Sequence, residues 1–116
     1  MINVESFSRG HTYTRQEVWK VRLAIGAVDG GVVTRIEFSL LQKEWERLRK
    51  SIQHRTDGLT IGSKKADQLT VSGEHKAASF ALGNGVIVSV YVDEDIFNVL
   101  KEFVDNVFEE AETSAT

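Results

Sequence analysis

The sequence predicts an α+β domain in which an antiparallel sheet of about four to six strands packs one face against two amphipathic helices. Three observations lead to this prediction. Several stretches alternate apolar and polar residues, glycine-containing turns separate them, and two longer segments repeat apolar residues at helical spacing. A chain of 116 residues is long enough for one core. We therefore expect a single domain over residues 1–111, followed by a disordered polar tail over residues 112–116.

The first pair of strands is predicted between residues 17 and 40. In the first strand the apolar residues fall at every second position, namely Trp19, Val21, Leu23 and Ile25. Asp29–Gly30–Gly31 then predicts a turn, because glycine reaches the positive φ that hairpin turns require. The return strand places one apolar set on a single face, namely Val32, Ile36, Phe38 and Leu40. Both strands are thus expected to bury one face.

A helix is predicted after this hairpin. Its buried stripe repeats at steps of four, three and four residues, through Leu41, Trp45, Leu48 and Ile52. Ser39 and Gln42 have the spacing of a capping box, in which each side chain satisfies a backbone N–H at the start of a helix. Asp57–Gly58 is the expected stop.

The stretch GLTIGSKKADQ, residues 58–68, resembles a phosphate-binding loop at first sight. Only three residues separate Gly58 from Gly62, however, the serine precedes the lysines, and no helix follows, so the requirements of a P-loop are not met. Two short strands, residues 59–61 and 68–71, fit better. They predict a hairpin whose tip, residues 62–66, projects Lys64 and Lys65 into solvent.

The last third of the chain repeats the order strand, glycine turn, strand, helix. Strands are predicted over residues 76–82 and 86–92, around Gly83–Asn84–Gly85. The helix follows Asp93, a suitable N-cap, and a wide apolar face runs through Ile96, Phe97, Leu100, Phe103, Val104, Val107 and Phe108. The domain can therefore be read as two ββα-like halves, either as a true repeat or as two similar amphipathic units.

Residues that would carry catalysis or bind a metal form no known pattern. The chain has no cysteine, and its three histidines, His11, His54 and His75, occur in separate segments without metal-ligand spacing. No nucleophile motif accompanies them. We accordingly expect no enzyme, no catalytic residue, no cofactor and no metal site. The N-terminal residues lack a secretory signal pattern and no apolar run is long enough to cross a bilayer, so a cytoplasmic protein without membrane contact is expected.

The face of the sheet opposite the helices is the predicted partner surface. It is expected to be basic in the first half and small and mildly apolar in the second, and together with the Lys64–Lys65 tip it supplies the candidate residues Lys20, Arg22, Arg35, Lys64, Lys65, Ile87 and Tyr91. The predicted function is a non-catalytic interaction or regulatory module that binds another protein or a second copy of itself as a homodimer. The alternative is a single-stranded nucleic-acid binder that uses the five cations of this set.

Overall fold

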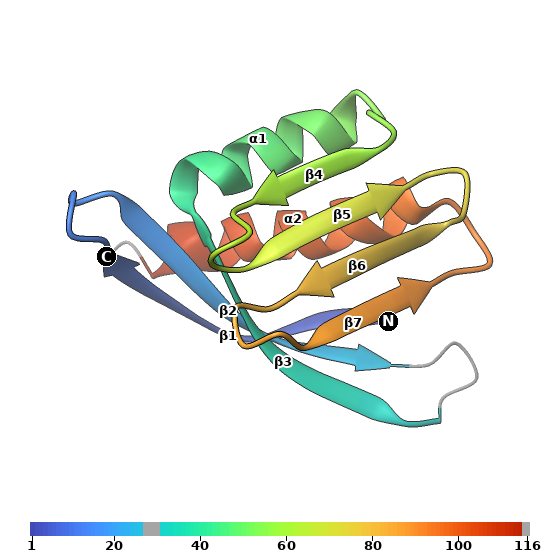
Figure 1. Ribbon diagram of the computed structural model, residues 1–116, viewed down its shortest axis with the longest axis horizontal. Coiled ribbons are helices and arrows are strands. Elements are labelled where there is room, and N and C mark those ends of the chain that lie inside the picture. Colours follow the sequence, from blue (N-terminus) through green and yellow to red (C-terminus); the bar gives the residue numbers. More distant parts are fainter. Residues whose placement is uncertain (27–30, 115–116) are drawn as a thin grey trace.

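The computed structural model of the protein contains two antiparallel sheets and two helices, and it describes residues 1–26 and 31–114 (Figure 1). Sheet A has the strand order β1-β2-β3, and sheet B has the order β4-β5-β6-β7. In chain order the elements are β1 Ile2–His11, β2 Glu17–Gly26, β3 Val33–Leu41, α1 Gln42–Gln53, β4 Leu59–Gly62, β5 Gln68–Ser72, β6 Ala77–Ala81, β7 Ile87–Tyr91 and α2 Ile96–Thr113. The predicted α+β class is thus confirmed.

The prediction of one sheet with four to six strands is wrong, because the described residues form seven strands in two sheets. Strand β1 was not predicted. A β-bulge between Val4 and Ser6 shifts its register against β2, so its apolar residues do not alternate regularly. The two ββα units are present in chain order, as β2-β3-α1 and β6-β7-α2, but their strands belong to different sheets.

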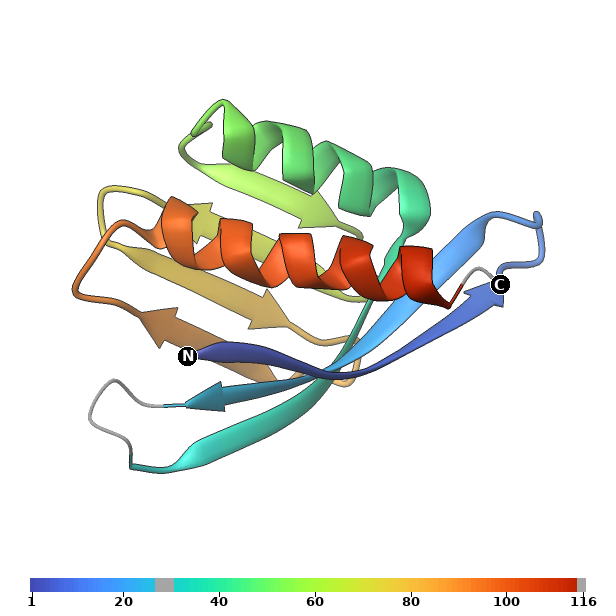
Figure 2. The same cartoon turned by 180° about the vertical axis from the view of Figure 1, so that it is seen from behind.

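Both helices cover the same face of sheet B, as the view from behind shows (Figure 2). Strand β1 runs beside α2, and the guanidinium of Arg9 donates a hydrogen bond of 2.6 Å to the carbonyl of Ala111 near the end of that helix. No helix or strand of the described residues lies over the other face of sheet B, which is in front in Figure 1. The predicted arrangement of helices on one face of a sheet is therefore correct for sheet B.

Four aromatic rings join the two sheets and the two helices into one core. Phe38 of β3 lies edge-to-face against Phe80 of β6, with ring centroids 5.0 Å apart, and against Trp45 of α1 at 5.9 Å. Phe103 of α2 contacts Trp45 and Phe80 at 5.8 and 6.2 Å. All four side chains are fully buried. Such edge-to-face pairs add to the free energy gained from burying apolar area, so this cluster ties the layers together.

Both predicted N-caps are wrong by two residues. Leu41 is the N-cap of α1, and its N–H donates to Glu44 Oε1 at 2.9 Å, whereas Ser39 still belongs to β3. Asp95, and not Asp93, caps α2 by accepting the N–H of Phe97 at 3.0 Å. In each case the preceding strand or turn continues further than the pattern of side chains suggested.

The remaining boundaries follow the predictions in part. Helix α1 ends at Gln53, before the expected stop at Asp57–Gly58. Helix α2 continues to Thr113, two residues into the predicted tail, and residues 115–116 lie outside the described part. The hairpin between β4 and β5 is confirmed, with Gly62 at a φ of +109°. The predicted Asp29–Gly30–Gly31 turn falls mostly on residues 27–30, outside the described residues.

Candidate functional site

The open face of sheet B carries no charged side chain. Residues on this face alternate with the buried ones along each strand. They are Thr60, Gly62, Gln68, Thr70, Ser72, Ala77, Ser79, Ala81, Ile87, Ser89 and Tyr91. Most of these side chains are small and none is charged, so the face is suited to contact with another polypeptide rather than with a charged polymer.

Strand β7 forms the outer edge of this face and bears its largest apolar groups. Ile87 and Tyr91 are each 67% exposed. Between them Ser89 shares a hydrogen bond of 2.9 Å with the hydroxyl of Ser79 on β6. β7 pairs with β6 on one side, and the strand order leaves its other side without a strand. An apolar edge of this kind is unusual on a free protein surface.

A groove of about 300 Å³ runs along this outer side of β7. Its other wall is the end of the β2–β3 hairpin. The lining residues are Ile25, Gly26, Val32, Thr34, Val88, Ser89, Val90 and Tyr91, and none of them is charged.

On the hairpin side of this groove, residues are exposed although their positions alternate in phase with buried residues of β3. Val32 and Thr34 alternate with the same phase as Ile36 and Phe38, which are buried. Val32 is nevertheless 81% exposed. The sequence pattern placed Val32 in the core, and the structure corrects this, because sheet B ends at β7 and nothing described covers the hairpin beyond it. This wall of the groove is thus an uncovered continuation of the face of sheet A that carries the buried residues Ile36 and Phe38.

The predicted basic residues of sheet A are on an exposed face, but acidic neighbours accompany them. Glu37 lies 3.9 Å from both Lys20 and Arg22, and it stands directly opposite Arg22 in the β2–β3 register. Arg35 forms a closer pair, 3.1 Å, with Glu5 of β1. Exposed pairs of this kind contribute little to stability, but they reduce the positive field that the cations would present to a phosphate backbone.

The other predicted site residues lie in two further places. Lys64 and Lys65 are exposed at the β4–β5 turn, as expected, and no ion pair to either is found in the described part of the chain. Ile87 and Tyr91 lie on β7. The structure therefore does not form one continuous surface from the seven candidates. It separates a charged sheet A, a basic turn and an apolar edge.

Asp67 connects the two sheets, a role that no sequence pattern predicts. Its Oδ2 accepts the backbone N–H of Ser39 in β3 at 2.9 Å, and its Oδ1 accepts that of Gly83 in the β6–β7 turn at 2.8 Å. One carboxylate thus holds the end of β3 against the turn that leads into β7. This contact connects sheet A to the turn that precedes β7.

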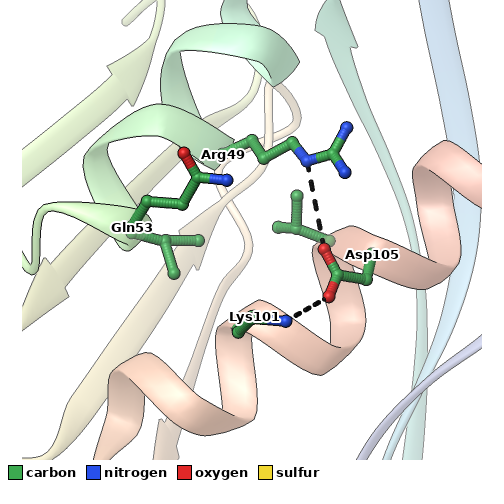
Figure 3. Close-up of a pocket in the computed structure, with 6 residues that line it drawn as sticks. Arg49, Gln53, Lys101 and Asp105 are labelled. Atoms are coloured by element: carbon green, nitrogen blue, oxygen red, sulfur yellow. Dashed lines mark hydrogen bonds and ion pairs between the residues drawn. The ribbon is translucent and has the colours of Figure 1, made fainter.

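A second cleft, of about 160 Å³, lies between the two helices (Figure 3). Asp105 extends from α2 between two cations, with Oδ2 2.6 Å from Lys101 Nζ and Oδ1 4.0 Å from Arg49 Nε. Gln53 borders the same cleft from α1. Because the aspartate already pairs with both cations, the cleft offers no free charged group for a ligand, and we assign it a structural role.

Within residues 1–26 and 31–114, no three side chains of histidine, aspartate or glutamate gather as a metal site would require. No helix in that part of the chain is both long and apolar enough to cross a membrane. Comparison with protein-family models, with curated proteins and with solved structures gave no match. The candidate site therefore depends on the geometry around β7 alone.

Proposed function

We propose that the protein is a non-catalytic interaction module that binds another polypeptide along β7 and the adjoining open face of sheet B. The observation that carries this proposal is the uncharged groove beside β7, in which Val32 and Thr34 are exposed although they continue the parity of the buried residues of β3. Burying apolar area is the main driving force of most protein association, and about 25 cal/mol is gained for each Å² removed from water. Ile87 and Tyr91 are suited to serve as anchors at the centre of such an interface.

The nucleic-acid alternative has less support. Its cations on sheet A share Glu37 and Glu5, and the apolar groove contains no cation. Of the predicted basic surface, Lys64 and Lys65 are the residues without an ion pair to any described residue. A single-strand binder would also need exposed aromatic rings next to them for base stacking.

A pair of matched double variants tests the proposal. Ile87→Glu with Tyr91→Glu places charges on β7, and Lys64→Glu with Lys65→Glu reverses charges at the distant turn. Proteins that copurify with the wild type from its own organism are identified and purified, and calorimetry measures their affinity for each variant. We expect the β7 variant to weaken binding at least about tenfold, while the turn variant binds within about threefold.

Equal affinity of both variants for every purified partner would refute an interface on β7. The nucleic-acid alternative is checked on the same proteins with a fluorescent single strand at rising salt concentration. Binding that falls steeply with salt and is lost in the turn variant would establish that alternative instead. Light scattering identifies self-association, because a wild-type dimer that the β7 variant converts to a monomer has a second copy as its partner.

A further inference from the structure

We infer that β7 accepts an extended, uncharged polypeptide segment as an additional strand of sheet B. This inference rests on the proposed function and states how the partner binds. It begins with a comparison of the four sheet edges, because an unpaired edge strand exposes backbone N–H and C=O groups that can pair with any other strand.

Three of the four edges are protected. β1 contains a bulge, and Arg9 on it donates to a carbonyl of α2. β3 carries the charged side chains Arg35 and Glu37 along its exposed half. β4 has four residues, and Arg47 of α1 donates to one of its carbonyls at 3.3 Å. β7 alone has neither a charge, a bulge nor a covering helix among the described residues. Protection of this kind is how proteins prevent pairing at an edge, so its absence on β7 marks the edge that is free to pair.

The hydrogen bonds of the β6–β7 hairpin show which backbone groups are available. The N–H of Val92 donates to the carbonyl of Lys76 at 3.0 Å, and the carbonyl of Val86 accepts from Leu82 at 2.8 Å. In an antiparallel ladder alternate residues turn both polar groups to the same neighbour. The even-numbered residues of β7 therefore pair with β6, and the outward groups belong to Ile87, Ser89 and Tyr91. An incoming strand meets three N–H groups and three carbonyls.

The groove determines what the side chains of that strand must be. Side chains on the helix-covered side of sheet B would lie against the exposed Val32 and Thr34 of the hairpin, next to Val88 and Val90. Side chains on the open face of sheet B would lie beside Ile87 and Tyr91. Neither position has a charged neighbour that could pair with a buried charge, and an unpaired charge there would lose its hydration without compensation. The fitting segment therefore has apolar or hydroxyl side chains at its centre, with β-branched residues favoured.

A linear segment fits this groove better than the β7 edge of a second copy. In symmetric edge-to-edge pairing, the β7 strands of two copies would lie side by side. Each copy has its β2–β3 hairpin beside its own β7, so the second copy would bring its sheet A and helices toward the space that this hairpin occupies. A single strand brings no such layer with it. This is the recognition mode in which main-chain hydrogen bonds supply affinity and the flanking side chains select the sequence.

A random peptide library displayed on phage is the probe, because the natural partner is unidentified. Selection uses the whole wild-type chain and counter-selection uses Ser89→Pro. Proline removes the N–H of residue 89, which points away from β6, so the β6–β7 ladder is kept. Ser89→Ala is the matched control, because it removes the side-chain bond to Ser79 and keeps the N–H.

We expect enriched peptides with an uncharged, β-branched centre, and a synthetic peptide from that set should bind the wild type. Ser89→Pro should weaken this peptide at least about tenfold, and Ser89→Ala should change its affinity less than about threefold. Alternate residues of the bound peptide direct their N–H groups toward β7, and the residues between them direct theirs away. N-methylation of the first set should abolish binding, and N-methylation of the second set should leave it nearly unchanged.

Residue-resolved amide exchange on the wild type gives a test that needs no variant. In the free protein the amides of Ile87, Ser89 and Tyr91 should exchange faster than those of Val88 and Val90, and the selected peptide should protect the first three. The inference is overturned if no peptide is enriched over Ser89→Pro, if bound peptide leaves these amides unprotected, or if they are already protected in a wild-type dimer. A partner that needs Ile87 and Tyr91 but binds Ser89→Pro normally would overturn strand addition while the proposed function stands.

Discussion

Replacing Asp67 with alanine removes the acceptor of two backbone hydrogen bonds that connect sheet A with sheet B. The bonds come from Ser39 at 2.9 Å and from Gly83 at 2.8 Å. A hydrogen bond to a charged acceptor contributes about 1.5–3 kcal/mol, and both of these lie where water can replace the carboxylate, so the lower value applies. Asp67→Ala should therefore lower the free energy of unfolding by about 3 kcal/mol.

Asp67→Asn distinguishes the hydrogen bonds from the charge. The amide keeps one oxygen that can accept, but its NH₂ group then faces the second backbone N–H, so one bond is lost. We expect a loss of about 1.5–2 kcal/mol. Lys65→Ala in the same turn is the control, because Lys65 is exposed and its side chain forms no hydrogen bond or ion pair with a described residue, and it should stay within about 0.5 kcal/mol of the wild type.

Equilibrium unfolding in urea, followed by tryptophan fluorescence, measures these differences, since Trp19 and Trp45 are both buried in the folded protein. With a slope of about 2 kcal/mol per molar urea, Asp67→Ala should lower the midpoint by about 1.5 M. The melting temperature should fall by about 12 °C for a domain of this size. If Asp67→Ala unfolds at the same urea concentration as Lys65→Ala, the carboxylate does not hold the two sheets together, and the reasoning is refuted.

Three further predictions about the fold, two of them with a control substitution, use the same unfolding measurement. Asp95→Ala should cost about 1 kcal/mol by removing the cap of α2, whereas Asp93→Ala should cost under about 0.5, and the reverse order would restore Asp93 as the cap. Gly62→Ala should cost more than about 2 kcal/mol, because φ is +109° and a Cβ would lie 2.3 Å from the Asp67 carbonyl, whereas Gly85→Ala, with open space around it, should cost about 1. Phe80→Ala should cost about 3–5 kcal/mol, and a loss below about 2 would show that the ring cluster is not central.

Elements with strong local periodicity were predictable from the sequence. Strands β2 and β3, the hairpin at Gly62 and the buried stripe of α1 follow from the alternation or the helical spacing of their apolar residues. Strand β1 was not predictable in this way, because its bulge interrupts the alternation and its outer half is mostly exposed. The division into two sheets depends on contacts between distant residues, such as the bond from Ser39 to Asp67, which no local pattern contains.

The candidate site was predictable for the apolar edge but not for the basic surface. Ile87 and Tyr91 are exposed as their parity indicated. The cations on sheet A were also placed on an exposed face, but their partners depend on register. Arg22 stands opposite Glu37 only in the observed pairing of β2 with β3, and a shift of two residues would bring a different neighbour. The loop between these strands does not determine the register from its sequence, so the neutralising pairs could not be foreseen.

Val32 was predicted to lie in the core, but it is exposed and lines the groove beside β7. Substitutions at this residue therefore test the groove. Val32 directly precedes β3 and has the same parity as Ile36 within it, but Val32 is 81% exposed and Ile36 is 7% exposed. Ile36→Thr should therefore cost about 2 kcal/mol, because it places a hydroxyl in the core, while Val32→Thr should change stability by less than about 0.5 kcal/mol. Val32→Asp, equally tolerated by the free protein, should weaken a peptide bound beside β7 at least about tenfold, because its charge would be buried without a partner. Urea unfolding and peptide affinity measured on the same three variants check both expectations. If Val32→Asp unfolds the protein as readily as Ile36→Thr, Val32 is covered within the chain itself, and the groove is not a place where another strand can lie.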